Sequence, residues 1–116
     1  MVVDMVDEER TDQVFRALAD PTRRDIVRRA LQDEHSVSDL ARRYPMSFAA
    51  VQKHVAVLQR AGLVHKDRRG REQLVRGDIG AIRAAYRLLE DFEALWRSRM
   101  DRFGEVLAET DEGAST

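Results

Sequence analysis

Cysteine is absent from the 116-residue sequence, and proline occupies only two positions. A chain without cysteine forms no disulfide, no thiolate zinc or iron–sulfur site and no thiol nucleophile. Its three histidines, His35, His54 and His65, are too few and too scattered to form an evident metal cage. Charged residues recur so often that no stretch approaches the roughly 20 apolar residues of a membrane span. Residues 1–10 are acidic and lack the pattern of a signal peptide, so we expect a cytoplasmic protein without membrane contact.

Motifs of the common enzyme classes are also missing. The sequence has no glycine-rich phosphate loop, no Gly-x-Ser-x-Gly nucleophile elbow and no His-Glu-x-x-His metal motif. Acidic neighbours such as Glu90 and Asp91 lie among arginines, which is more typical of a solvated or interfacial helix face than of an acid/base pair. We therefore expect no catalytic activity and no cofactor.

The net charge of −1 conceals an uneven distribution of charge along the chain. Residues 20–71 contain twelve basic and six acidic side chains, whereas residues 1–19 and 72–116 carry net charges of −3 and −4. A basic centre between acidic ends indicates a polyanionic partner for the centre. Chance fluctuation in a highly charged sequence is the alternative explanation.

Hydrophobic periodicity and capping residues predict one small, mainly α-helical domain with a single β-hairpin. Asp20 and Ser47 are typical N-cap residues, and Gly62 suits the left-handed position that ends a helix. The five expected helices cover residues 11–18, 21–32, 36–44, 47–61 and 78–109, and the two strands cover residues 63–68 and 72–76. The domain is expected over residues 11–109, with a flexible arm at residues 1–10 and a polar tail at residues 110–116.

Two helices joined by a short turn and followed by a hairpin are typical of a winged helix-turn-helix. Such a fold inserts its second helix into the DNA major groove, and the hairpin reaches the flanking backbone or the minor groove. We predict that this helix contacts double-stranded DNA through Ser47, Phe48, Ala49, Gln52, Lys53 and His54, and that the hairpin contacts it through Arg68, Arg69 and Arg71. Glutamine can pair with adenine, and lysine can contact guanine or a phosphate.

Several of these residues also have an interpretation that does not involve DNA. Phe48 can fold back onto the third helix instead of packing on a thymine methyl group, and His54 can pack against a neighbouring helix instead of contacting a phosphate. Gln52 and Lys53 can form a plain solvated face. A winged helix can also serve as a protein–protein interaction module without specific DNA binding. Such a module has no reason to concentrate twelve basic side chains around these elements, so DNA is the favoured partner.

Two segments resemble the ArsR (SmtB-like) family of bacterial repressors. They are ALADPTRRDIV at residues 17–27 and MSFAAVQKHVAVL at residues 46–58, the second followed by AGLV at residues 61–64. The resemblance extends over about residues 11–109. It implies a homodimeric winged-helix repressor that binds a palindromic operator, often in its own promoter, with the first and last helices forming the dimer interface.

The sequence departs from this family where many members bind metal. Metal-sensing members often carry CVCDL at the start of the third helix, where this chain has SVSDL at residues 36–40. Hydroxyl groups are poor ligands for soft metals. Other members bind zinc through histidines of the last helix, and residues 78–109 contain none. The chain therefore resembles a branch without the usual metal ligands. His35 with His65 is the remaining metal candidate, although surface histidines are far more common, and the pattern identifies no inducer.

The predicted last helix also indicates a dimer from its own composition. It carries more large apolar side chains than a small core can cover, and such an exposed strip is an association site. The first helix offers a complementary surface, which would give a two-fold interface. The residues predicted to line this interface are Val14, Phe15 and Leu18 of the first helix and Phe92, Trp96, Met100, Phe103 and Leu107 of the last.

Overall fold

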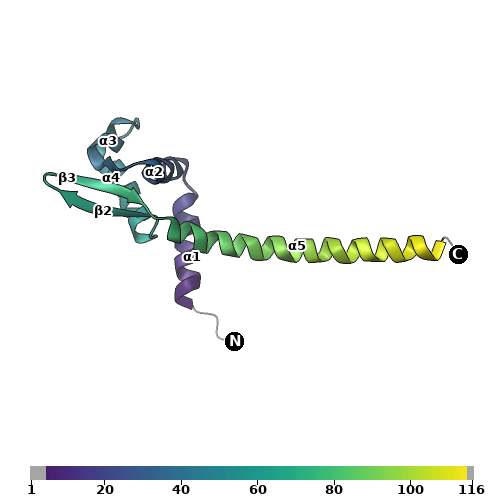
Figure 1. Cartoon of the computed structure of the whole chain (residues 1–116). Helices are drawn as coiled ribbons and strands as arrows, with labels where there is room; N and C mark the ends of the chain where they lie inside the picture. Colours follow the sequence, from purple (N-terminus) through teal and green to yellow (C-terminus); the bar gives the residue numbers. More distant parts are fainter. Residues whose placement is uncertain (1–4, 115–116) are drawn as a thin grey trace. The chain divides into compact units, whose positions relative to one another are not determined.

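The computed structural model describes residues 5–114, with side chains described over residues 8–109. The elements in chain order are α1 (Met5–Leu18), α2 (Pro21–Gln32), β1 (His35–Ser36), α3 (Val37–Arg42), α4 (Phe48–Arg60), β2 (Val64–Arg69), β3 (Glu72–Gly77) and α5 (Ile79–Ala114) (Figure 1). The chain divides into two compact units, of which the first ends at Ala85 and the second begins at Tyr86. The first turns of α5 therefore belong to the first unit, and the rest of the helix forms the second.

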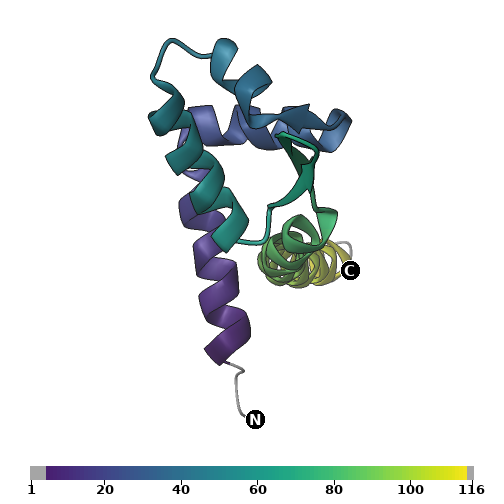
Figure 2. The same ribbon diagram turned by 90° about the vertical axis from the view of Figure 1, so that its left-hand side faces the viewer.

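The hydrophobic core of the first unit lies among α1, α2 and α4. Helices α1 and α4 pack against each other, and α2 lies across them (Figure 2). Apolar residues recur every three or four positions along each helix, so each helix presents one buried stripe. Residues of this core include Val14, Ala17, Ile26, Val27, Leu40, Val51, Val55, Leu58, Leu63 and Val75. This packing fixes α4 from one side and leaves its opposite face exposed.

The capping residues predicted from the sequence occupy their expected places. The Asp20 carboxylate accepts a hydrogen bond from the backbone N–H of Arg23 at 2.9 Å, which begins α2. The Ser47 hydroxyl accepts one from the backbone N–H of Ala50 at 3.1 Å, which begins α4. Gly62 follows α4 with a φ of +77°, a conformation that side chains other than glycine adopt rarely.

A third strand completes the sheet beside the predicted hairpin. Strands β2 and β3 pair antiparallel around Gly70, and β1 pairs antiparallel with the other edge of β3, which gives the order β1-β3-β2. Strand β1 has only two residues and was not predicted, because so short a segment carries no periodicity. It joins the start of α3 to the hairpin, so the helix-turn-helix and the wing share one framework.

Two terminal predictions need correction. Helix α1 begins at Met5, so residues 5–10 are helical and the expected loose arm is wrong there; residues 1–4 lie outside the described residues. The acidic residues 7–9 lie near the start of this helix, where negative charge stabilises the helix dipole. Helix α5 continues to Ala114, past the predicted end at Glu109.

None of the helices over residues 5–114 combines the length and apolar character of a membrane-spanning segment.

Candidate nucleic-acid interface

Helix α4 turns one face into the core and the other to solvent. Val51, Val55 and Leu58 are fully buried on the inner face. The outer face exposes five of the six α4 residues predicted to contact DNA, Ser47, Phe48, Ala49, Gln52 and Lys53. Phe48 retains 47% of its accessible surface, so it is not buried in the core. The outer face of α4 is therefore accessible to a groove that is as wide as a helix, such as the major groove of DNA.

A cleft of about 310 Å³ joins this face of α4 to the wing. Phe48 and Gln52 line it from α4, and Arg68 and Arg71 line it from the hairpin. The outer face of α4 and the wing, which were predicted separately to contact DNA, therefore form one continuous surface. Two guanidinium groups beside an aromatic ring and an amide form a surface that suits a phosphate backbone and the base edges next to it.

The third predicted wing residue, Arg69, lies differently. Its guanidinium is 3.7 Å from the Glu34 carboxylate, in a solvent-exposed ion pair, and Arg69 does not line the cleft. Alternation along β2 places consecutive side chains on opposite faces of the sheet, so Arg68 and Arg69 point apart. The structure therefore separates Arg69 from the other two wing arginines.

Sequence reasoning missed three uncharged polar residues of the cleft, Ser36, Ser38 and Gln73. Gln73 lies opposite Arg68 in the β2–β3 register, so the predicted turn at Gly70 would have placed it there. Ser38 enters the cleft from α3, and no local pattern indicated that this helix borders the wing. Glu72 also lines the cleft, so a carboxylate stands beside the cationic groups.

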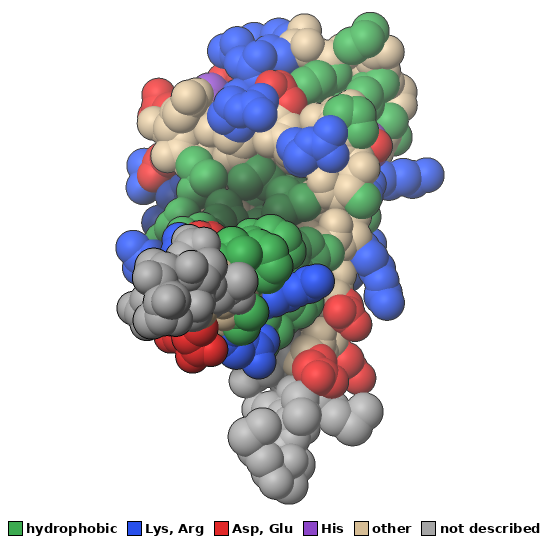
Figure 3. Space-filling model, turned by 90° about the vertical axis from the view of Figure 1, so that its right-hand side faces the viewer, with side chains coloured by type: hydrophobic (Ala, Val, Ile, Leu, Met, Phe, Trp, Pro, Cys, Tyr) green, Lys and Arg blue, Asp and Glu red, His purple; other side chains and the backbone are tan. Residues whose placement is uncertain are grey.

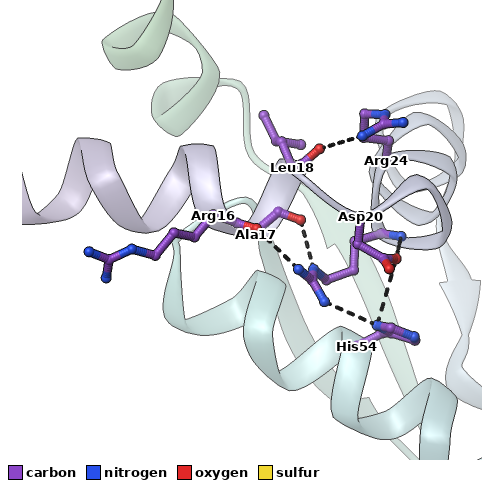
Figure 4. A network of polar contacts seen from close by, with 7 residues as sticks. Arg16, Ala17, Leu18, Asp20, Arg24 and His54 are labelled. Carbon is purple, nitrogen blue, oxygen red and sulfur yellow. Dashed lines mark hydrogen bonds and ion pairs between the residues drawn. The ribbon is translucent and has the colours of Figure 1, made fainter.

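His54 lies on the side of α4 that faces the α1–α2 junction (Figure 4). Its Nδ1 atom is 3.5 Å from the Arg23 guanidinium and 4.0 Å from the Asp20 carboxylate. The same guanidinium donates hydrogen bonds to the carbonyl oxygens of Ala17 at 2.7 Å and Arg16 at 3.1 Å. These contacts match the structural alternative for His54, packing against a neighbouring helix.

Arg23 therefore links three helices. It closes the carboxyl end of α1, belongs to α2 and contacts α4 through His54. The backbone N–H of Arg23, with the nearby charges of His54 and Arg23, holds the pKa of Asp20 below its ordinary value of 3.8. Arg24 adds a hydrogen bond to the carbonyl oxygen of Leu18 at 2.8 Å. The ALADPTRR segment thus holds α1 and α2 in place against α4.

A second polar cluster anchors the turn of the helix-turn-helix. The Tyr44 hydroxyl, in the turn after α3, donates to the Asp25 carboxylate of α2 at 2.6 Å, and Arg29 donates to the same oxygen at 2.9 Å. The Tyr44 and Arg29 hydrogen bonds lower the pKa of Asp25. Burial and the Asp25 carboxylate raise the pKa of Tyr44 to about 12. The cluster holds the turn that precedes α4 against α2.

Tyr44→Phe is expected to lower the free energy of unfolding by about 1 kcal/mol near pH 7. Because the folded pKa of Asp25 is depressed, its contribution is present above the ordinary value of 3.8 and is lost as the pH falls through the folded pKa. The cost of the substitution should therefore shrink at acid pH. Urea denaturation near pH 7 and near pH 3 measures it, with Tyr86→Phe on exposed α5 as the control. An equal cost at both pH values would contradict the role given to Asp25.

His65 and Asp78 form a hydrogen-bonded contact at the base of the wing. Their nearest side-chain atoms, Nε2 and Oδ2, are 2.6 Å apart, and both side chains are substantially exposed. The His65 contact, followed by a hydrogen bond from the backbone N–H of Gly80, lowers the pKa of Asp78. Over the described residues, no group of three or more potential His or carboxylate ligands gathers as a metal ion would require.

The two helices predicted to form a dimer interface differ in what they expose. Val14 retains only 2% of its surface and belongs to the chain's own core, which leaves it little surface for the predicted interface. Phe15 and Leu18 pack partly against the same core. On α5, by contrast, the exposed fractions are 57% for Trp96 and 59% for Phe103. Figure 3 shows hydrophobic side chains gathered along one side of this helix, with charged side chains around the rest. Leu95 and Val106 are also exposed and were not predicted.

Comparisons with known proteins agree with the helix-turn-helix assignment. The helix-turn-helix domain family matches residues 18–67. The HTH-type transcriptional regulator Rv2034 of Mycobacterium tuberculosis is 32% identical over 96 residues, which cover 83% of this chain and 87% of the relative. The crystal structure of the ArsR family transcriptional regulator RHA00566 has a TM-score of 0.75 and 30% identity, and covers 78% of this chain and 94% of its own. An ArsR-like transcriptional regulator from Rhodococcus sp. RHA1 has a TM-score of 0.74 and 33% identity, with coverages of 85% and 93%.

Proposed function

We propose that this chain, which belongs to the ArsR family of winged helix-turn-helix transcriptional regulators, acts as a dimeric repressor of a two-fold symmetric operator. DNA binding through the helix-turn-helix follows from membership of this family. The repressor role, the symmetry of the operator and the independence from a metal ion are the proposal itself.

The cleft between α4 and the wing carries the proposal. It places the exposed side chains of Phe48 and Gln52 beside the guanidinium groups of Arg68 and Arg71. One α4 face then suits the base edges of a single major groove, and the wing suits the adjoining backbone. A second copy would present the same face one helical turn away, about 34 Å along the DNA. A protein bound in this way over a promoter excludes RNA polymerase.

Selection of DNA fragments from a genomic pool with the purified protein would identify the operator. Footprinting should then reveal two inverted half-sites with centres about one helical turn apart. Transcription from the selected promoter in vitro should fall as the protein is added. A single asymmetric footprint would contradict the symmetric dimer, and increased transcription would contradict the repressor role. Failure to enrich any sequence would favour the protein–protein interaction module.

Removal of the cleft arginines should change the salt dependence of binding. Each lost phosphate contact lowers the slope of log K against log salt by about 0.9. Arg68→Ala combined with Arg71→Ala should therefore lower it by roughly 2, and should weaken binding to all sequences similarly. Arg69→Ala is the matched control, and its smaller expected effect follows from the Glu34 ion pair. Fluorescence anisotropy over a salt series measures the slopes. Equal slopes for the double variant and the parent would contradict a contact between the wing and the DNA.

Metal ions should not release the protein from its operator. Ser38 lies in the cleft, and the Ser36 hydroxyl already accepts the backbone N–H of Asp39 at 3.0 Å as the cap of α3. Neither hydroxyl replaces a thiolate as a ligand for soft metals. Zinc, cadmium or arsenite titrated to one equivalent per subunit should therefore leave the anisotropy of a labelled operator complex unchanged. Stoichiometric metal binding coupled to DNA release would overturn this part of the proposal.

A further inference from the structure

The cleft between α4 and the wing is lined by four parts of the first unit. Helices α3 and α4 contact each other and the wing contacts both, so the fold itself holds the cleft in shape. The lining residues come from β1, α3, α4 and the wing and are Ser36, Ser38, Phe48, Gln52, Arg68, Arg71, Glu72 and Gln73. The volume of about 310 Å³ falls in the range of small-molecule pockets, about 300–1,000 Å³. A cleft of this size can receive a small ligand as well as one edge of a DNA groove.

The charged side chains of the cleft are two cations and one anion. The ion pairs of residues 8–109 include neither Arg68 nor Arg71, and they do not include Glu72. The Nε atom of Arg68 donates to the Gly70 carbonyl oxygen at 3.4 Å, which leaves its two terminal nitrogens for a ligand. Two guanidinium groups and one carboxylate give the cleft a net charge of +1. Its charge therefore suits a ligand with a single negative charge.

The uncharged residues of the cleft suit the remainder of such a ligand. Phe48 retains 47% of its surface, so its ring offers a flat apolar face beside the guanidinium groups. Gln52 and Gln73 supply amide donors and acceptors. Ser36 is only 5% exposed, and its oxygen accepts the backbone N–H of Asp39 at 3.0 Å, so its own hydroxyl proton remains for donation. An aromatic ring that bears one carboxylate matches these groups, because rings stack on rings and guanidinium groups pair with carboxylates.

We propose that the cleft binds an aromatic monocarboxylate, with its carboxylate on Arg68 and Arg71 and its ring against Phe48, and that this ligand releases the protein from DNA. The same guanidinium groups and the same ring are assigned above to the operator, so the ligand and the DNA compete for them. Binding of the ligand stands on the cleft alone. Its effect on DNA rests on the proposed function, to which it adds the chemical class of the inducer.

Glu72 gives the cleft a preference for a single negative charge. Because this carboxylate offsets one of the two guanidinium groups, the cleft balances one negative charge and repels a second. A dianion such as sulfate is therefore disfavoured relative to a carboxylate. Two other cations, Lys53 and Arg69, adjoin lining residues in the sequence but do not line the cleft, and Arg69 is paired with Glu34.

Titration of the protein with sodium benzoate in the absence of DNA tests the ligand site by ¹H–¹⁵N NMR. Benzoate should shift the backbone signals of Ser38 and Gln73 until they saturate, and the other signals show whether each variant is folded. Arg68→Ala combined with Arg71→Ala should weaken binding more than about tenfold, because both charge-assisted contacts are lost. Arg69→Ala is the matched control, since it removes a guanidinium outside the cleft, and it should bind benzoate as the parent does. Shifts that do not saturate, or undiminished binding by the double variant, would overturn the inference.

Related acids test the ring contact and the charge preference. Phe48→Ala should weaken benzoate binding about fivefold and leave the binding of acetate, which has no ring, unchanged. Phthalate carries two carboxylates and should bind the parent more weakly than benzoate does. Glu72→Gln should raise the affinity for phthalate about threefold more than the affinity for benzoate. A parent protein that prefers phthalate, or a Phe48→Ala protein that binds benzoate normally, would contradict these contacts.

Competition with DNA is measured with the selected operator. Benzoate should lower the anisotropy of the labelled complex at the concentrations that shift the NMR signals, whereas acetate at the same ionic strength should have little effect. Benzoate bound in the cleft of an intact operator complex would overturn the competition. Failure to enrich any operator would overturn the proposed function, and the NMR titration would still decide the ligand site by itself.

Discussion

Replacing Gln52 and Lys53 together by alanine is expected to abolish specific operator binding while the protein stays folded. Both side chains are exposed on the outer face of α4, whereas Val51, Val55 and Leu58 pack in the core on the inner face. A good side-chain contact to a base contributes about 1–3 kcal/mol of discrimination, so the loss of two should weaken specific binding at least about 30-fold. Anisotropy with the selected operator and with a scrambled duplex measures the specific and the non-specific component.

The control for this experiment is Arg10→Ala with Gln13→Ala, which removes one cation and one glutamine from exposed positions of α1. Its operator affinity should stay close to that of the parent, and thermal unfolding should show that both double variants are folded. If the α4 variant protected the operator as the parent does, α4 would not be the recognition helix. A similar loss on both duplexes would mean that these side chains contact only phosphates.

Local sequence signals predicted most of the fold. An N-cap acts within about three residues of itself, so Asp20, Ser36 and Ser47 marked the starts of α2, α3 and α4 without tertiary information. The spacing of Val51, Val55 and Leu58 then identified the inner face of α4, and the outer face followed by exclusion. The helix-turn-helix pattern and the basic centre of the chain indicated DNA as the partner, and the family resemblance added a dimer on a palindromic operator.

The sequence did not reveal what depends on contacts between distant elements. Val14 satisfies the helical spacing of an interface residue and of a core residue equally, and only packing against α2 and α4 assigns it to the core. His54 is adjacent to Lys53 in the sequence, but the helical turn directs it toward Asp20 and Arg23 instead of toward the cleft. The separation of Arg69 from Arg68 likewise depends on Glu34, which lies far from both in the sequence.

The second large effect is expected from Trp96→Asp, which should convert the dimer to a monomer and remove specific DNA binding. Trp96 is 57% exposed in a single copy and lies among the exposed apolar side chains of α5. If α5 forms part of the proposed dimer interface, the substitution places a carboxylate in a contact that excludes water. Burial of an unpaired charge costs several kcal/mol, so the dimer should weaken by roughly a hundredfold or more. Sedimentation over a concentration series measures this change.

Loss of operator binding should accompany loss of the dimer, although Trp96 lies outside the DNA-binding unit. A monomer reads one half-site, whereas a dimer holds two recognition helices at a fixed spacing and gains the second contact without a second loss of translational freedom. The matched control Ser98→Asp adds the same charge on the opposite side of α5 and should leave both assembly and binding intact. Trp96→Phe, which keeps an aromatic ring at this position, should remain dimeric. A Trp96→Asp protein that sediments as a dimer and binds the operator normally would show that the copies associate through another surface.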